Sequence, residues 1–132
     1  MKTYLFLFLA ICTLSGCNND DNTSLDDCPI TFETAYVESA NAPASGIVGE
    51  NIAIDVLFNV KNGCGSFNAF EESIMGNSRT IIVSAKYEGC FCTQAIVNLN
   101  AIYNFKADVA GEYELKFKSG ENDYVLVTIS IQ

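Results

Sequence analysis

Residues 51–60, NIAIDVLFNV, decide the class of fold because large apolar side chains occupy every second position. In an extended chain alternate side chains point to opposite faces, so one face would carry Ile52, Ile54, Val56, Phe58 and Val60. Asp55 and Asn59 would fall on the other face. A period of two, with β-branched and aromatic residues, is typical of a strand that buries one side. The stretch therefore predicts a half-buried sheet.

The same alternation recurs along the rest of the chain. Further strands are expected at 80–87, 96–106, 112–118 and 124–131, with a weaker one at 30–38 and a short one at 66–70. Glu71 to Met75 is the best candidate for a single helical turn. Short strands with one apolar face each predict two sheets packed face to face. We expect an all-β sandwich of about seven antiparallel strands over residues 29–132.

One motif resembles a known family. Tyr103-x-Phe105, followed by Asp108-Val109-Ala110-Gly111-x-Tyr113-x-Leu115, is similar to the start of the penultimate strand of bacterial immunoglobulin-like domains. The resemblance covers residues 30–132 and implies an immunoglobulin-like sandwich. It also implies that Tyr113 is a tyrosine corner, whose hydroxyl bonds to a backbone group slightly upstream. The chain departs from antibody domains because it has no Trp and no Cys in the strand of Tyr113.

The N-terminus has the architecture of a secretory signal. A short start with one lysine precedes the apolar run from Tyr4 to Thr13, which is too short to cross a bilayer as a helix. The following residues, Leu14-Ser15-Gly16-Cys17, resemble the lipobox of bacterial lipoproteins. The resemblance implies that residues 1–16 are removed, that the Cys17 sulfur receives diacylglycerol, and that its new amine receives an acyl chain such as palmitate. The alternative is an ordinary secretory signal with a chance cysteine.

Residues 17–28 are polar and acidic, and we expect the lipidated Cys17 to be followed by a flexible tether. The acidic pair Asp20-Asp21 resembles the surface-export signal of Bacteroidota lipoproteins. Together the two resemblances imply a protein held in the outer membrane by its N-terminal lipid and facing the cell exterior. The periplasmic face is the alternative location. A calcium loop is disfavoured because the segment lacks the spaced ligands and turn glycine of an EF-hand.

Composition argues against catalysis. The chain carries 16 acidic and 7 basic residues and no His. A net charge of −9 without a basic stripe disfavours nucleic-acid binding. The absence of His removes the Ser-His and Cys-His nucleophile pairs and the commonest transition-metal ligand. Glu71-Glu72, the adjacent carboxylate pair of the domain, reads as a solvated loop. We therefore expect no enzyme activity, no cofactor and no metal.

Four cysteines remain in the domain: Cys28, Cys64, Cys90 and Cys92. An exported chain is expected to pair them as disulfides. With strands arranged in the immunoglobulin manner, the strand after Cys92 would pair with the strand before Cys64, and all four cysteines would lie at one end of the sandwich. We predict that Cys28 and Cys64 each bond to one member of Cys90-Phe91-Cys92, in an order that the sequence leaves open. A four-thiolate metal site or a redox pair are the alternatives.

Three aromatic residues are candidates for a binding surface near these cysteines. Phe67, Phe70 and Phe91 could gather there and bind a glycan or an extracellular protein. The competing interpretation places Phe67 and Phe70 in the core and leaves Phe91 exposed. The sequence thus favours a non-catalytic binding or structural module. The alternatives are a protease inhibitor that presents the loop from Glu88 to Thr93 and a thiolate metal-binding protein.

Overall fold

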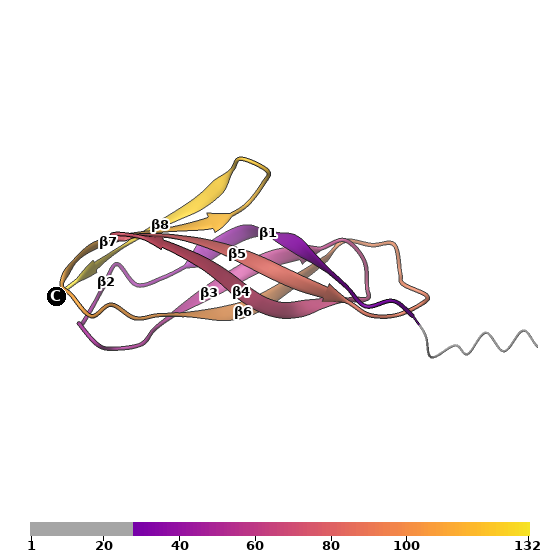
Figure 1. Ribbon diagram of the computed structural model, residues 1–132, viewed down its shortest axis with the longest axis horizontal. Helices are drawn as coiled ribbons and strands as arrows, with labels where there is room; N and C mark the ends of the chain where they lie inside the picture. The colour runs from indigo at the N-terminus through magenta and orange to yellow at the C-terminus, as the bar shows by residue number, and fades with distance from the viewer. Residues whose placement is uncertain (1–27) are drawn as a thin grey trace, which may run out of the picture.

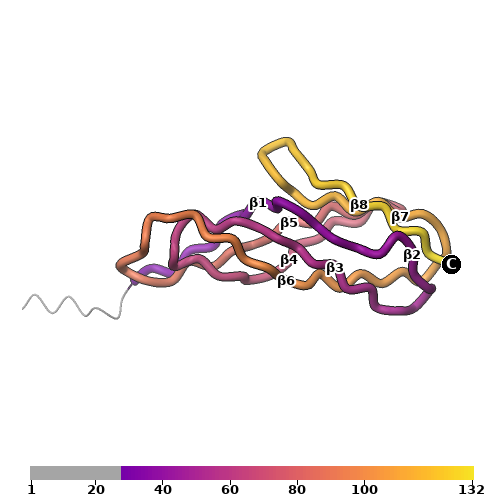
Figure 2. The backbone as a smooth tube through the Cα atoms, turned by 180° about the vertical axis from the view of Figure 1, so that it is seen from behind, coloured from indigo at the N-terminus to yellow at the C-terminus, as the bar shows by residue number. Residues whose placement is uncertain are grey.

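The computed structural model describes residues 28–132. The predicted signal peptide at 1–16 lies outside the described residues, as does the predicted tether at 17–28 except for Cys28. The described chain forms an elongated body that begins at one end and finishes at the other (Figures 1 and 2). No helix occurs between residues 28 and 132, and hence none that could cross a membrane.

Eight strands follow one another along the described chain and lie in two layers. They are β1 (Thr31–Asn41), β2 (Ser45–Gly46), β3 (Ile52–Val60), β4 (Gly65–Met75), β5 (Ser78–Tyr87), β6 (Val97–Phe105), β7 (Gly111–Lys118) and β8 (Tyr124–Ile131). One layer has the order β4-β5-β7-β8-β2, and the other contains β3 and β6. The predicted all-β sandwich is confirmed.

Strand β1 belongs to both layers. Its first half, from Thr31 to Ala35, pairs antiparallel with β5. Its second half, from Tyr36 to Asn41, pairs antiparallel with β3 in the opposite layer. The register shifts between Val37 and Ser39, and such a bulge bends and twists a strand. The first strand therefore joins the two layers through its own backbone.

The pairing is mixed, so the prediction of wholly antiparallel strands was wrong. β5 runs parallel to β7, and β2 runs parallel to β8. The reason for the first pair is the path of the chain. Between β5 and β7 the chain crosses to the other layer, where β6 runs antiparallel to β3. It then returns to the first layer in its original direction.

Strand β4 also corrects the sequence interpretation. It is a continuous strand of 11 residues, whereas we expected a short strand at 66–70 and a helical turn at Glu71–Met75. It pairs with β5 from Gly65 opposite Tyr87 to Met75 opposite Ser78. Most of its side chains are exposed because it lies at an edge of its layer, so the period of two is weak. Backbone pairing, rather than apolar burial, fixes its conformation.

The core fills the space between the layers with the residues that alternate inward. In β3 the side chains at every second position from Ile52 to Val60 are buried, as the sequence predicted. The largest fully buried side chains are Phe58, Phe105 and Phe117. Tyr103 meets the ring of Phe117 edge-on, with centroids 5.6 Å apart. Aromatic rings from β3, β6 and β7 thus form the centre of a sandwich that contains no Trp.

Phe117→Ala should lower the free energy of unfolding by about 3–5 kcal/mol, because it removes a fully buried ring and leaves a cavity. Phe32→Ala is the matched control, since Phe32 is 58% exposed and its loss should cost about 0.5 kcal/mol. Denaturant titration of both variants measures the difference. Equal losses would contradict the assigned core.

Candidate functional site

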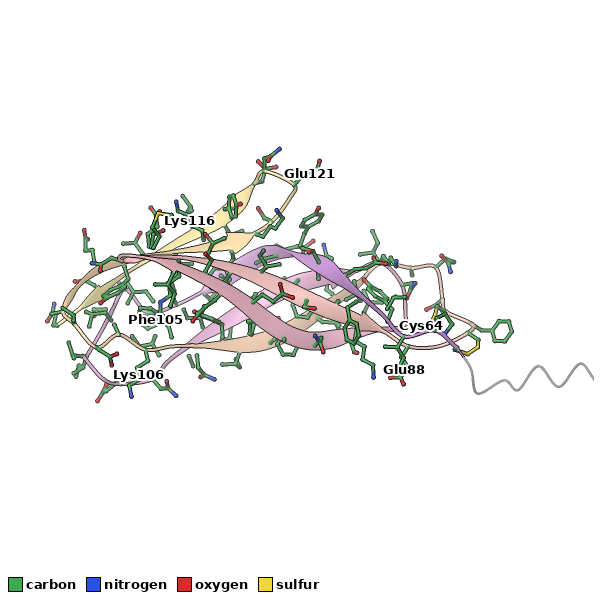
Figure 3. The ribbon with its side chains drawn as sticks, in the orientation of Figure 1. Cys64, Glu88, Phe105, Lys106, Lys116 and Glu121 are labelled. Atoms are coloured by element: carbon green, nitrogen blue, oxygen red, sulfur yellow. A yellow bond between two sulfur atoms is a disulfide. The ribbon has the colours of Figure 1, made fainter. Side chains whose placement is uncertain are left out.

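The four domain cysteines gather at the end of the body where the described chain begins. Disulfides join Cys28 to Cys90, with Cα atoms 5.1 Å apart, and Cys64 to Cys92, with Cα atoms 5.3 Å apart. Figure 3 shows Cys64 at this end, far from Phe105. The pairing settles the order that the sequence left open. We call the region formed by Cys28, the β3–β4 turn and residues 88–94 the cysteine pole.

Local sequence explains how the β3–β4 turn presents Cys64. The side chain of Asn62 accepts a hydrogen bond from the backbone N–H of Cys64 at 3.0 Å, as an Asx turn does. The turn is then tied to the β5–β6 loop at two points. The N–H of Gly63 donates to the carbonyl of Thr93 at 2.9 Å, and the N–H of Glu88 donates to the carbonyl of Cys64 at 3.3 Å. Backbone and disulfide together fix residues 88–94.

Gly89 is required by the close approach of this loop to a disulfide. Its φ of +146° lies in a region that side chains rarely adopt. A Cβ atom there would lie 2.8 Å from the Sγ atom of Cys64. Any side chain at this position would therefore strain the loop.

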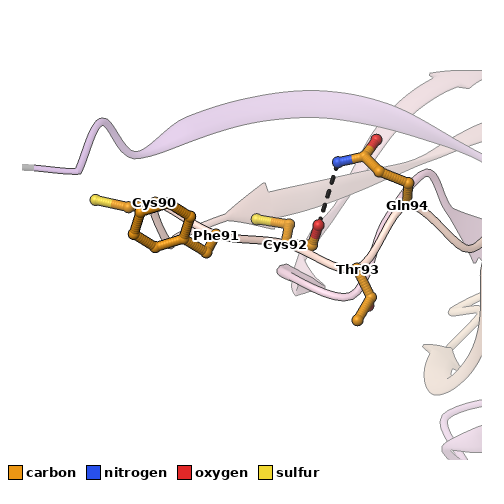
Figure 4. A pocket seen from close by; sticks show the side chains of 5 residues that line it. All are labelled: Cys90, Phe91, Cys92, Thr93 and Gln94. Carbon is orange, nitrogen blue, oxygen red and sulfur yellow. Dashed lines mark hydrogen bonds between the residues drawn. The ribbon is translucent and has the colours of Figure 1, made fainter.

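Phe91 is the most exposed large apolar residue that the structure shows, with 90% of its surface accessible. It stands between two cysteines whose sulfur atoms are bonded back into the domain (Figure 4). Phe91 lines an open surface pocket together with Cys90, Cys92, Thr93 and Gln94. The Gln94 amide donates to the carbonyl of Cys92 at 3.2 Å, which closes the loop on itself. The ring therefore projects from a braced loop.

Phe67 and Phe70 form a separate group. Phe67 is 40% exposed, and its ring contacts those of Phe58 at 6.0 Å and Phe70 at 4.9 Å. Phe70 packs against the core and meets the ring of Tyr103 at 5.3 Å. The structure thus attaches both rings to the sandwich interior, and Phe91 stands apart from them.

The disulfides determine what the cysteine pole can do chemically. In this bonded state its four sulfur atoms offer no thiolate to a metal ion or to a redox reaction. Within residues 28–132 there is no group of three acidic, cysteine or histidine side chains that could hold a metal. What the pole presents is an exposed apolar ring on a braced backbone.

Tyr113 has the geometry that the resemblance implied. Its hydroxyl donates to the carbonyl of Val109 at 2.8 Å, and its ring lies 5.3 Å from that of Phe105. The bond spans four residues and holds the start of β7 against the core. This role is structural and lies outside the cysteine pole.

A polar cluster that the sequence pattern did not indicate lies between the layers. The Tyr103 hydroxyl on β6 donates to the Glu72 carboxylate on β4. Arg79 on β5 lies 3.5 Å from the same carboxylate and donates to the carbonyl of Lys106 at 2.8 Å. Glu72 therefore lies in a strand with specific partners, and its assignment to a solvated loop was wrong. Its partner Tyr103 is 31 residues away, and no local motif joins the two.

Burial and the hydrogen bond to Glu72 raise the pKa of Tyr103 to about 12 from its ordinary value of 10.0. The hydroxyl loses solvent in the core, and a phenolate there would face the carboxylate. Arg79 lowers the pKa by a smaller amount. The neutral phenol is thus the form that bridges the two layers.

The Tyr103 bridge should be lost at high pH. The folded chain holds this proton to about pH 12, whereas the unfolded chain releases it near 10, so the stabilisation is complete below pH 10 and declines between the two values. The loss should reach about 2 kcal/mol. Tyr103→Phe should remove this part of the pH dependence, which denaturant titrations of both proteins from about pH 9 to about pH 12 measure. Parallel curves would contradict the assigned bridge.

Most of the described chain matches a known protein family. The profile of the ORF11 beta-sandwich domain matches residues 54–131, which is more than half of the chain. The chain belongs to the ORF11 beta-sandwich family. The matched region runs from β3 to β8 and includes Cys64, Phe91 and Cys92, whereas β1 and Cys28 precede it. No curated protein and no solved structure matches the chain significantly.

Gly89→Ala in this ORF11 beta-sandwich domain should lower the free energy of unfolding by about 1–3 kcal/mol, through both backbone strain and the clash with the Cys64 sulfur. Gly76→Ala is the matched control. Gly76 also has a positive φ, +59°, but open space surrounds its Cβ position, so about 1 kcal/mol is expected. Denaturant midpoints and free-thiol titration compare the two. An equal loss in both variants would show that the sulfur contact has no effect.

Proposed function

We propose that this ORF11 beta-sandwich protein is a lipid-anchored module of the outer membrane that faces the cell exterior and binds, without catalysis, through the Phe91 loop. The observation that carries the proposal is the exposure of Phe91, 90% accessible between two disulfide-bonded cysteines. The lipobox resemblance at Leu14-Ser15-Gly16-Cys17 and the acidic segment after it support the location.

Two properties of the Phe91 loop favour binding, namely the apolar side chain that it leaves in water and its fixed backbone. Burying a phenylalanine side chain contributes about 1.5–3 kcal/mol of favourable free energy. Phe91 gains almost none of it in the folded domain, because the side chain stays exposed. An aromatic ring that is fixed before binding loses little conformational freedom when it is buried in a partner. Two disulfides and the bonds of Gly63 and Glu88 hold this loop in one conformation. Such an arrangement favours a role of the loop in contacting a partner over a purely structural role.

The disulfides also support an exported location. Disulfides form and persist outside the reducing cytosol, and this domain commits all four of its cysteines to them. With several acyl chains on Cys17 the protein would stay on the membrane, whereas a single chain would bind it only marginally. The net charge of −9 adds no electrostatic attraction to anionic lipid, so the acyl chains would supply the anchor.

A second candidate function is inhibition of a secreted protease by the same loop. The observation that favours it is again the bracing of residues 88–94, because an inhibitor must hold its loop rigid in an enzyme's cleft. We rank it below the binding module because the bracing is the one feature that supports it, whereas the lipobox and the acidic segment also support the module.

The anchor is tested by the mass of the mature protein extracted from membranes. We expect an N-terminal peptide that begins at Cys17 and carries acyl mass, and a domain four protons lighter than its reduced form. Cys17→Ala should abolish the acyl mass and release the protein from the membrane fraction. An unmodified Cys17 in the natural protein would overturn the proposed location. Protease added to intact cells tests orientation, and full protection would exclude the outer surface.

A further inference from the structure

We propose that the partner of the Phe91 loop is the lipid bilayer that holds the chain. The ring would enter the interfacial region of the membrane, and the domain would stand with the cysteine pole on the lipid and its C-terminal end directed away. This inference rests on the proposed function, since it takes the acyl anchor at Cys17 as given. It adds an orientation and a second point of contact.

The position of the anchor segment points to the membrane. The described chain begins at Cys28, and the disulfide from Cys28 to Cys90 places that point beside the residue that precedes Phe91. Cys17 lies eleven residues before Cys28. A fully extended chain of that length spans at most about 40 Å. The anchor segment therefore joins the body at the end that carries Phe91, and a tether of this length would hold that end near the lipid.

The chemistry of the cysteine pole suits a bilayer interface. Ile96 is 71% exposed and Ile30 is 48% exposed, and these residues follow closely after Cys92 and Cys28. Ile96 lies beside Val60, Lys61 and Tyr87, where it adds exposed apolar surface to this end of the body. Phenylalanine is among the residues that interfacial segments bury at the boundary between lipid headgroups and acyl chains.

Two ion pairs lie near the cysteine pole. Lys86 pairs with Glu88 on β5 and the following loop, and Lys61 pairs with Glu33 across β3 and β1. Neither ion pair leaves an excess of positive charge that would recruit anionic lipid. Entry of the ring would therefore depend on apolar burial, and it should be strongest on zwitterionic lipid.

A single ring is sufficient to orient the domain because the acyl anchor already holds the domain at the membrane surface. A short link converts the second contact into an intramolecular event, with an effective concentration in the millimolar range. The loop is also rigid, so burying the ring requires no further ordering of the chain. Under these conditions a weak contact is enough to orient the domain.

Tryptophan fluorescence tests the proposal, because the natural chain contains no Trp. The acylated mature protein carrying Phe91→Trp is reconstituted in phosphatidylcholine vesicles, with and without brominated acyl chains as quenchers. Met75→Trp is the matched control. Met75 is 83% exposed, and it ends the strand β4 that starts beside Cys64, so it lies at the opposite end of the body.

We expect emission from Phe91→Trp to shift to shorter wavelength on vesicles and to be quenched at least twofold by brominated lipid. Emission from Met75→Trp should keep its value in water. If the protein floats with the vesicles and Phe91→Trp is not quenched, the lipid contact is overturned while the anchor stands. Equal quenching of both variants would overturn the proposed orientation. Failure of both acylated proteins to float would show that the acyl chains do not hold the domain on a bilayer, and so that the proposed function is wrong.

Discussion

Burial of inward-pointing apolar side chains between two layers is the constraint on which the rest of this protein depends. The rings of Phe58, Phe105 and Phe117 fill the space, and the alternation along β3, β6 and β7 follows from the need to point apolar side chains inward. The layers are joined on one side by β1, which passes from one to the other through a bulge. On the other side the edges β4 and β6 are joined by the bond between Tyr103 and Glu72. One side of the sandwich is thus closed by backbone and the other by side chains.

The cysteine pole is held together by a different kind of force. Residues 88–94 contribute little to the core, and Cys90 and Phe91 are exposed, so apolar burial cannot fix this loop. The disulfides replace it by removing loop-closure entropy from the unfolded chain. They also link the loop to the start of β1 and to the β3–β4 turn. Because covalent bonds hold the backbone, the loop can leave a large apolar side chain in water without unfolding around it.

The sequence predicted those parts of the fold that carry a local signal. The strand at residues 52–60 was predicted because its inward face is continuous, and the bond of Tyr113 was implied because its acceptor lies four residues away. β4 was misread because an exposed edge strand has no apolar alternation. The parallel pairing of β5 with β7 depends on which layer β6 joins, and that choice is made by packing across the whole chain.

The candidate site was also predicted only in part. The meeting of four cysteines at one end followed from strand order, because the strand after Cys92 was expected to pair with the strand before Cys64, and β6 does pair with β3. The partner of each cysteine did not follow, since Cys90 and Cys92 are two residues apart and either could reach Cys28. The structure resolves this by assigning Cys90 to Cys28. That assignment places the exposed ring next to the point where the chain leaves for its N-terminus. Under the proposed function, the acyl anchor and the Phe91 ring would act on the same membrane surface from the same end of the domain.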